Sequence, residues 1–416
     1  MNSVDPFRLV VTGGGTGGHT YPALTAVRTL QARLAGEGRA LETVWIGTAD
    51  GLEARVAPAE GIAFTSVVTG KIRRSKNPLK LASPANVRDM ARVPLGVVQA
   101  RKAIDEFRPD VVLATGGYVA VPAGLAARLC RRPLVLHEQT VRLGLANRKL
   151  AASASRICVS SESTLQLLSE SARQVAVVTG NPVRPEVLAG VPDRAVQALQ
   201  LWGFNRDLPT VYVTGGAQGS QQINELVAEV LPWLLQGANL VHQCGPANVE
   251  GLRARVAGLP ADLAGRYYLA GFVGPELPDV LALADVVVSR SGAGTLAELT
   301  ALGKPAVFVP LASAAGNEQA HNARHLQEAG AAVALEGEVT PERLRDALGP
   351  LLADAGLRRG MAERARAYGR PDAADRLVDE ILSAASGRPV TGPAEQTSGS
   401  VPPRRASATT ANGERR

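Results

Sequence analysis

The sequence predicts an α/β protein made of two similar domains, each with a parallel sheet covered by helices. Two stretches that lie roughly 200 residues apart share one order of features: a short apolar run, a glycine-rich loop and a helical pattern. Further short apolar runs alternate with helical patterns through both halves, as the buried strands of parallel sheets do. The length of 416 residues fits two or three domains at roughly 100 to 200 residues each. We therefore expect a cleft between two domains.

The first half begins with the apolar run 7–12, which predicts a buried strand followed by a glycine loop over 13–18 and a helix over 22–34. Later apolar runs of the same kind predict further strands at 44–47, 111–115, 134–137, 156–159 and 175–178. The segment 180–185 contains a glycine and two prolines, which interrupt regular structure. The boundary between the domains is therefore placed there.

The second half repeats the order with a strand at 210–214, a glycine loop at 215–220 and a helix that ends near 235. Its other predicted strands are 239–243, 267–270, 286–289, 306–309 and 332–335. From 341 to 383 the pattern is helical, and after 387 large apolar residues nearly vanish while Pro, Ser, Thr, Gly and Ala become frequent. We expect a first domain over 1–182, a second domain over 183–366, a C-terminal helix over 367–385 that packs back toward the first domain, and a disordered tail over 386–416.

The composition excludes several classes of protein. Cys130, Cys158 and Cys244 are far apart, so they predict neither a disulfide framework nor a metal clamp, and a reducing cytoplasm fits them. The N-terminus lacks the basic and apolar regions of a signal peptide. The longest uncharged stretch, 230–249, is too polar for a membrane span. We expect a soluble protein.

The net charge of +7 is concentrated in one stretch. Residues 71–108 contain ten basic residues against three acidic ones, with Leu and Val side chains between them. This pattern predicts an anionic membrane surface as the partner, and a solvated face is the alternative. Aromatic residues are only 4% of the chain, which disfavours nucleic acid because bases need aromatic rings to stack on.

Four glycine-containing loops follow predicted strands, at 13–18, 115–118, 215–220 and 289–295. Ligands of parallel α/β sheets bind at the carboxyl ends of strands, so the loops predict two phosphate-bearing ligands, as in group transfer from a nucleotide-activated donor. Tight turns alone would explain one or two of them. The first loop matches a dinucleotide fingerprint, but the strand 44–47 does not end in an acidic residue, which disfavours NAD. The absence of Gly-Lys-Ser/Thr disfavours ATP hydrolysis.

Several motifs together carry a specific resemblance. They are 14-GGTGGH-19 with 21-YPA-23, 116-GGY-118, 137-HEQ-139, 144-GLANR-148, 180-GNPVR-184 and 289-SRSGA-293 with Glu298. In this order, over roughly residues 7 to 385, the chain resembles the MurG family of bacterial glycosyltransferases. The resemblance implies the GT-B architecture of two facing Rossmann-like domains.

The resemblance also implies an activity. Family members transfer GlcNAc from UDP-GlcNAc to the C4 hydroxyl of undecaprenyl-diphosphate-linked muramoyl pentapeptide, with inversion. It implies a peripheral enzyme on the cytoplasmic face of the cell membrane, acting in cell-wall biogenesis, cell shape and cell division, with other cell-wall synthesis proteins as partners. No cofactor and no metal are implied. The alternatives are a GT-B transferase with another lipid acceptor, a UDP-sugar epimerase, and a non-catalytic UDP-sugar-binding module.

The implied donor site combines the glycine loops with charged residues of the second domain. Glu298 would hold the ribose hydroxyls, Gln319 the sugar hydroxyls and Arg184 the diphosphate. The full set of implied donor-binding residues is Thr16, Gly17, Gly18, Arg184, Ala217, Gln218, Ala293, Gly294, Thr295, Leu296, Ala297, Glu298 and Gln319.

The implied acceptor site lies in the first domain, and His19 is the candidate general base. A neutral imidazole can accept a proton at pH 7, but a histidine after a glycine loop could also bind an acceptor phosphate. For His137, hydrogen-bonded positioning is favoured over catalysis. The implied acceptor-binding residues are Gly14, Gly15, Gly116, Gly117, Tyr118, His137, Glu138, Gln139, Thr140 and Asn147.

Two positions depart from the family pattern. Ala217 stands where the family has a serine, and Thr140 stands where it has an asparagine. Each change is expected to weaken one contact by roughly 1 kcal/mol without abolishing the site.

Overall fold

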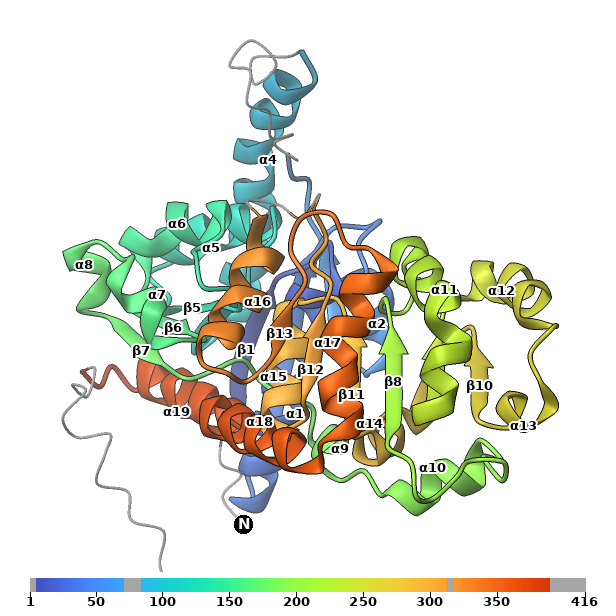
Figure 1. Ribbon diagram of the computed structural model, residues 1–416. Helices are drawn as coiled ribbons and strands as arrows, with labels where there is room; N and C mark the ends of the chain where they lie inside the picture. The colour runs from blue at the N-terminus through green and yellow to red at the C-terminus, as the bar shows by residue number, and fades with distance from the viewer. Residues whose placement is uncertain (1–4, 71–83, 313, 315–316, 390–416) are drawn as a thin grey trace, which may run out of the picture.

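The computed structural model describes residues 5–70, 84–312, 314 and 317–389. Within these ranges the strands form two parallel sheets, one of seven strands and one of six, with helices on both faces of each (Figure 1). The predicted architecture of two Rossmann-like domains is therefore confirmed. The predicted tail beyond residue 389 lies outside the described residues, as do residues 71–83 of the basic stretch.

The first sheet has the order β3-β2-β1-β4-β5-β6-β7. Its strands are β1 (Phe7–Thr12), β2 (Leu41–Gly47), β3 (Ala63–Ser66), β4 (Val111–Ala114), β5 (Leu134–Glu138), β6 (Arg156–Val159) and β7 (Ala176–Val178). Strands β1, β4 and β5 are neighbours, so the loops that follow them lie side by side at one edge. The sequence analysis missed β3, because this four-residue edge strand has no run of buried apolar side chains.

Helices cover both faces of the first sheet. They are α1 (Gly17–Gly36), α2 (Glu53–Ala59), α4 (Pro84–Phe107), α5 (Ala120–Leu129), α6 (Leu145–Leu150), α7 (Glu162–Gln166) and α8 (Glu170–Arg173). Leu30 of α1 packs in the core of one face, and Ile104 of α4 packs in the core of the other. Helix α1 begins five residues before the predicted start at 22, so Pro22 lies inside it.

The second sheet has the order β10-β9-β8-β11-β12-β13. Its strands are β8 (Thr210–Thr214), β9 (Asn239–Gln243), β10 (Tyr267–Ala270), β11 (Val286–Ser289), β12 (Ala306–Phe308) and β13 (Val333–Ala334). The main helices around it are α9 (Pro185–Leu188), α10 (Pro192–Ala198), α11 (Gln221–Gly237), α12 (Val249–Val256), α13 (Ala261–Ala264), α14 (Leu277–Leu283), α15 (Ala293–Leu302), α16 (Glu318–Glu328), α17 (Pro341–Ala353) and α18 (Ala355–Tyr368). All six strands lie within two residues of the predicted ranges.

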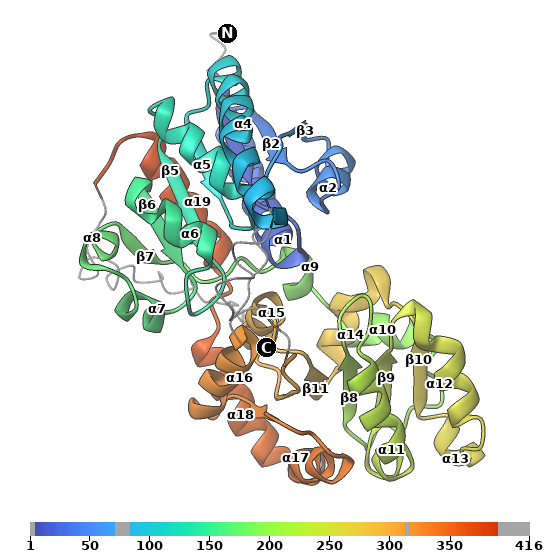
Figure 2. The same cartoon turned by 90° about the horizontal axis from the view of Figure 1, so that it is seen from above.

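The last helix, α19 (Ala373–Ala385), returns to the first domain (Figure 2). Leu377, Val378 and Ile381 are fully buried in the same core as α1. The two segments that cross between the domains meet at Gly180, where φ is +87° and an added Cβ would lie 2.9 Å from the Cβ of Ala373. A larger residue at position 180 would therefore separate the crossing segments.

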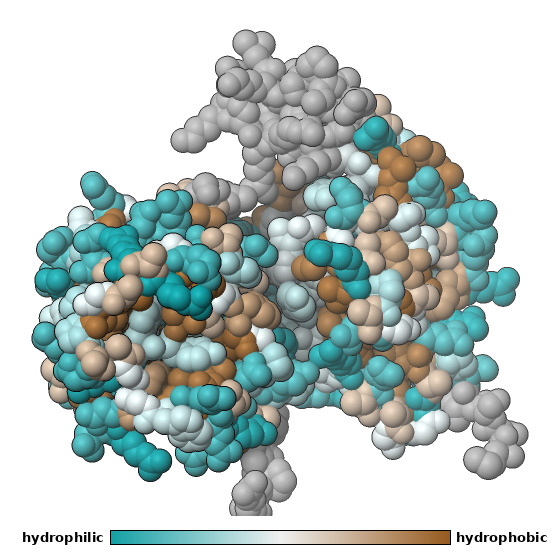
Figure 3. All heavy atoms as spheres, turned by 90° about the vertical axis from the view of Figure 1, so that its right-hand side faces the viewer, coloured by the Kyte–Doolittle hydropathy of each residue, from teal (hydrophilic) through white to brown (hydrophobic). Residues whose placement is uncertain are grey.

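The surface is hollowed between two lobes (Figure 3). No helix of the described ranges combines the length and the apolar character that crossing a membrane requires.

Candidate active site

The first glycine loop rests on a buried carboxylate that the sequence analysis missed. Glu53 is fully buried and accepts hydrogen bonds from the backbone N–H of Gly15 (3.0 Å) and from the N–H and hydroxyl of Thr48 (both 3.0 Å). A Cβ on Gly14 would lie 2.1 Å from the carboxyl carbon of Glu53. The amide of Gly15 is thus engaged inside the protein, and a negative charge lies directly under the loop. The available signal was an acidic residue shortly after the second strand.

His19 lies in the first turn of α1 and is half-buried. Its Nδ1 lies 2.9 Å from the carbonyl oxygen of Thr115 and 3.1 Å from Oε1 of Gln139. The hydroxyl of Thr115 donates to the carbonyl oxygen of His19 at 2.8 Å. The carboxyl ends of β1, β4 and β5 therefore meet at this imidazole.

Gln139 and His137 form a buried network behind His19. Nε2 of Gln139 lies 2.8 Å from the Thr115 carbonyl oxygen and 3.0 Å from Nδ1 of His137. Nε2 of His137 lies 3.0 Å from the carbonyl oxygen of Gly180, at the crossing between the domains. Burial lowers the pKa of His137 to about 4; the Gly180 carbonyl opposes this shift and His19 adds to it. His137 is therefore neutral near pH 7.

Glu138 organises the loop that follows β5. Its carboxylate accepts from the N–H and hydroxyl of Thr140 (3.1 and 2.8 Å), from the N–H of Gly144 (2.8 Å) and from Nδ2 of Asn147 (3.0 Å). Glu138 is only 3% exposed. These bonds show that the carboxylate shapes the loop. Thr140, which departs from the family pattern, is one of its hydrogen-bond donors.

The other predicted acceptor residues surround His19. A Cβ on Gly116 would lie 3.0 Å from the imidazole, and one on Gly117 would lie 2.5 Å from the carbonyl oxygen of Gly14. Both residues have positive φ, so glycine is needed for conformation and for space. The ring of Tyr118 would be 3.2 Å from a Cβ on Gly15. The structure thus brings the first and second glycine loops into contact.

The donor residues predicted in the second domain gather at α15. Residues 293–298 form its first turns, and Glu298 is paired with Arg184 through contacts of 2.9 and 2.8 Å. Burial raises the pKa of Glu298, and the Arg184 guanidinium opposes the shift. The two residues expected to hold the ribose and the diphosphate therefore hold each other in this structure.

The third glycine loop is held by a second residue that the sequence analysis missed. Gln243 is 4% exposed and donates from Nε2 to the hydroxyl of Thr214 and the carbonyl oxygen of Gly216, both at 3.0 Å. Its Oε1 accepts from the N–H of Val273 at 2.9 Å. Ala217 and Gln218 are exposed at the tip of this loop. The sequence signal for Gln243 was its place as a polar residue at the end of a buried strand.

Gln319 lies farther along the edge of the second sheet, in the first turn of α16. Its Oε1 accepts from the N–H of Leu311 at 3.0 Å, and its carbonyl oxygen accepts from the hydroxyl of Ser291 at 2.8 Å. The first bond joins α16 to the segment that follows β12, and the second joins it to the segment that precedes α15. In the first domain, Thr16 and Gly18 are exposed at the start of α1 and Gly17 is half-buried.

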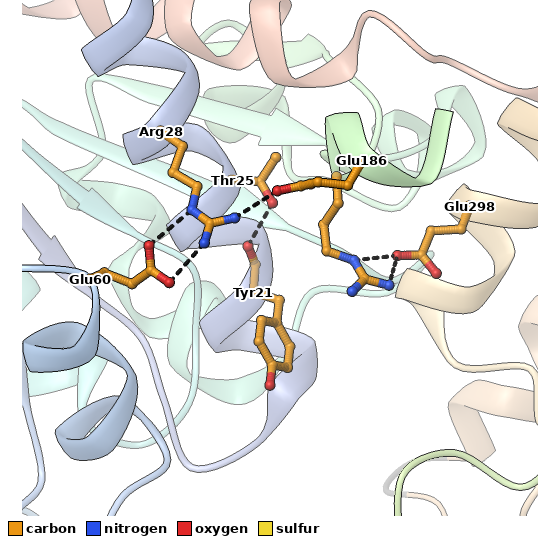
Figure 4. A network of polar contacts seen from close by, with 7 residues as sticks. Tyr21, Thr25, Arg28, Glu60, Glu186 and Glu298 are labelled. Atoms are coloured by element: carbon orange, nitrogen blue, oxygen red, sulfur yellow. Dashed lines mark hydrogen bonds and ion pairs between the residues drawn. The ribbon is translucent and has the colours of Figure 1, made fainter. Parts of the chain in front are cut away.

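Arg28 of α1 joins the two domains, and sequence reasoning did not single it out. Its guanidinium contacts Glu60 at 2.7 Å in the first domain and Glu186 of α9 at 2.9 Å (Figure 4). Arg28 and Glu186 also line a hollow of about 610 Å³ together with Tyr21, Arg184 and Gly274.

A second pocket lies between Gln139, which contacts His19, and the first turns of α15, which contain Glu298. Gln139 of the first domain and Ala293, Leu296 and Ala297 of α15 line it. Among the residues that the structure describes, no three His, Cys, Asp or Glu side chains cluster as metal ligands do. The pocket is therefore bounded by Gln139, which contacts His19, and by the helix that contains Glu298.

Comparison with known proteins identifies the family of this chain. Residues 9–159 match the N-terminal domain of glycosyltransferase family 28, and residues 210–377 match its C-terminal domain. The UDP-N-acetylglucosamine--N-acetylmuramyl-(pentapeptide) pyrophosphoryl-undecaprenol N-acetylglucosamine transferase of Halothermothrix orenii is 34% identical over 385 residues, which are 91% of this chain and 100% of the relative. The enzyme of the same name from Listeria monocytogenes serotype 4b is 35% identical over 378 residues, 90% of this chain and 99% of the relative.

Solved structures show the same relationship. MurG of Acinetobacter baumannii superimposes with a TM-score of 0.69 at 28% identity, covering 91% of this chain and 100% of that one. A UDP-GlcNAc 2-epimerase from Neisseria meningitidis has a TM-score of 0.62 at 14% identity, covering 90% of this chain and 99% of that one, and shares the fold alone. The sequence matches over nine tenths of the chain show that it belongs to glycosyltransferase family 28 and, within it, to the MurG family.

Proposed function

We propose that this protein transfers GlcNAc from UDP-GlcNAc to the C4 hydroxyl of undecaprenyl-diphosphate-linked muramoyl pentapeptide, the step that converts lipid I to lipid II. The carrying observation is that residues of both domains line the same pockets. Gln139, which contacts His19, lines one pocket with Ala293 and Ala297 of α15, and Arg184, which pairs with Glu298, lines the other with Tyr21 of α1. Full-length relatives bear the name of this activity. We therefore take the protein to be a hexosyltransferase of peptidoglycan synthesis.

The donor would bind against α15. Glu298 would accept hydrogen bonds from the ribose hydroxyls, and Arg184, released from Glu298, would pair with the diphosphate. The free N–H groups at the start of α15 favour negative charge, which grows on the leaving UDP. Gln319 and the loop residues Ala217 and Gln218 complete the proposed donor side.

The chemistry is a direct displacement. The C4 hydroxyl oxygen of the muramoyl sugar attacks the anomeric carbon of GlcNAc, and the bond from that carbon to the diphosphate oxygen breaks. The hydroxyl proton passes to His19, and UDP leaves. One displacement inverts the α-linked donor to a β-linked product. Because Nδ1 of His19 faces two oxygen acceptors, Nε2 is the nitrogen left to accept the proton.

Glu53 favours the general-base role of His19 over phosphate binding. A phosphate at the first glycine loop would lie near the buried carboxylate, and the amide of Gly15 is already engaged. A hydroxyl group has no such repulsion to overcome.

We also propose peripheral attachment to the inner face of the membrane through α4. Leu95 and Val98 are 53% and 64% exposed on this helix, which projects beyond the rest of the molecule (Figure 1). Residues 71–83 and the side chains of 84–90, which contain six of the ten basic groups, lie outside the described residues. Arg101 and Lys102 are partly neutralised by pairs with acidic residues one turn later, at 3.4 and 3.8 Å.

The test of the transferase is acceptor-dependent release of UDP. UDP release from UDP-GlcNAc is measured with and without a short-chain analogue of the muramoyl-pentapeptide lipid diphosphate. We expect release only with acceptor, and a decrease of roughly 10²- to 10⁴-fold in His19→Ala. His321→Ala, on α16, is the control and should retain activity. Folded protein that binds UDP-GlcNAc but releases no UDP with acceptor would refute the proposal, and conversion of UDP-GlcNAc to a different UDP-sugar without acceptor would favour an epimerase.

A further inference from the structure

We infer that Gln139 is a positioning residue whose side-chain amide orients His19 and keeps the proton of its neutral imidazole on Nδ1. The resemblance implies that Gln139 contacts the acceptor, and its hydrogen bonds inside the protein support this further role. The inference deepens the proposed function and rests on it where it concerns the reaction.

The surroundings of Gln139 determine which way its amide points. Nε2 faces three acceptors: the carbonyl oxygens of Thr115 (2.8 Å) and His137 (3.2 Å), and Nδ1 of His137 (3.0 Å). A flipped amide would place Oε1 against two carbonyl oxygens, which repel it. The NH₂ group therefore points to these partners, and Oε1 is left to face His19.

His137 fixes the orientation of the Gln139 amide through its own hydrogen bonds. Its Nε2 donates to the carbonyl oxygen of Gly180 at 3.0 Å, so in the neutral ring Nδ1 is the acceptor that Gln139 requires. His137 is fully buried, and Gln139 is 4% exposed. Neither side chain is free to reorient without breaking several hydrogen bonds.

The orientation of Gln139 determines which ring nitrogen of His19 carries the proton. Its Nδ1 faces Oε1 of Gln139 and the carbonyl oxygen of Thr115, which are both acceptors, so Nδ1 carries the proton. The unprotonated Nε2 then points away from the network and can accept the hydroxyl proton. When it does, the two acceptors stabilise the imidazolium, but as neutral groups they do so less than a carboxylate would.

The titratable groups around this network come from several elements. They are His137 and Glu138 at the end of β5, Glu53 of α2 under the glycine loop, and Tyr118 after β4. The carboxylates of Glu53 and Glu138 are both engaged with donors of their own. Gln139 is thus the side chain that sets the orientation and the tautomer of the His19 imidazole.

The first test is the pH profile of kcat/KM. In Gln139→Leu, loss of an acceptor destabilises the imidazolium, so the acid limb should move to lower pH by roughly one unit. The kcat should fall roughly 10- to 100-fold with both KM values little changed, because the base is no longer held in place. Gln139→Glu should move the acid limb to higher pH, because the acceptor facing His19 becomes charged. Opposite shifts in the two variants are the signature of the positioning role.

Gln243→Leu is a matched control. Gln243 is equally buried, ends β9 as Gln139 follows β5, and holds a glycine loop of the other domain. Its replacement should lower thermal stability by a similar amount and raise the KM for UDP-GlcNAc, while the acid limb stays in place. An unmoved acid limb in Gln139→Leu, or a loss confined to the KM of the acceptor, would overturn the inference.

A second measurement does not depend on activity. The ¹⁵N chemical shifts of histidine-labelled protein report which ring nitrogen carries the proton. Wild type should show His19 protonated on Nδ1 near pH 7.5, and Gln139→Leu should show a mixture of tautomers. A wild-type His19 protonated on Nε2 would overturn the inference even if the transferase assay succeeds. If that assay fails while the tautomer result holds, the proposed function is wrong and the positioning stands.

Discussion

Arg156 and Glu380 form an ion pair of 3.1 Å in which the side chains are only 7% and 13% exposed. Arg156 begins β6 and Glu380 lies in α19, so the pair attaches the C-terminal helix to the first sheet. Removing Arg156 leaves a buried carboxylate without its partner. We expect Arg156→Ala to lower the free energy of unfolding by roughly 3–5 kcal/mol in urea denaturation at pH 7.

The exposed pair of Arg253 and Glu250 provides the control for this prediction. Its side chains are 63% and 86% exposed. Arg253→Ala should change stability by less than about 1 kcal/mol. Equal effects of the two variants would mean that α19 does not depend on the buried pair.

Stability should fall in mildly acidic solution because two histidines are buried in neutral form. Burial lowers the pKa of both His137 and His242 to about 4, from an ordinary value of 6.5. Between these values the unfolded chain binds protons that the folded chain does not, so stability decreases as the pH falls. The loss should reach about 3 kcal/mol per histidine near pH 4.

Urea denaturation at a series of pH values from 7 to 4 measures this loss. His242→Gln should remove about half of the slope, and His321→Gln on α16 serves as the comparison. A slope that His242→Gln leaves unchanged would show that other groups cause the acid sensitivity.

The first glycine loop should tolerate no side chain at Gly14. A Cβ there would lie 2.1 Å from the carboxyl carbon of Glu53, so Gly14→Ala must displace that buried group. We expect a loss of roughly 2–4 kcal/mol of stability and most of the activity. Because the clash is with Glu53 itself, Gly14→Ala combined with Glu53→Ala should cost less than the sum of the single changes.

Gly36→Ala is the control for this cycle, measured by thermal melting. An added Cβ at Gly36 meets no atom within 4 Å among the described residues. This variant should change stability by no more than about 1 kcal/mol. Strict additivity of the Gly14 and Glu53 changes would contradict the proposed contact.

Donor affinity should depend on the charge of Glu298. Glu298→Gln keeps the size of the side chain but removes a charged acceptor, so UDP should bind roughly 10- to 100-fold more weakly in calorimetry. Glu250→Gln alters a carboxylate of the second domain that is 86% exposed and should leave UDP affinity nearly unchanged. Equal UDP affinity in wild type and Glu298→Gln would place the ribose elsewhere.

Attachment to membranes should require the apolar face of α4. Leu95→Asp combined with Val98→Asp should weaken binding to anionic vesicles at least about tenfold, because apolar contact is lost and negative charge is added. Leu167→Asp, an equally exposed leucine of the first domain, is the control. Binding should also weaken at high salt. Vesicle binding that neither the substitutions nor salt affect would refute this docking mode.

The sequence by itself determined the architecture and the identity of the key residue types. Strands of a parallel sheet are buried on both faces, so they need continuous apolar runs. The runs 7–12 and 210–214, each followed by a glycine loop and a helix, are such local patterns. The position of His19 directly after such a loop placed it at the ligand-binding edge of the sheet.

Only the tertiary structure decided what these residues contact. Gln139 lies 120 positions from His19, Glu53 lies 38 from Gly15, and Arg184 lies 114 from Glu298. These contacts arise because neighbouring strands of a sheet are distant in sequence, and no periodicity records which loops will meet. The structure therefore shows which groups Gln139 and Glu138 contact, and it revealed Glu53, Gln243 and Arg28, whose burial and partners depend on remote segments.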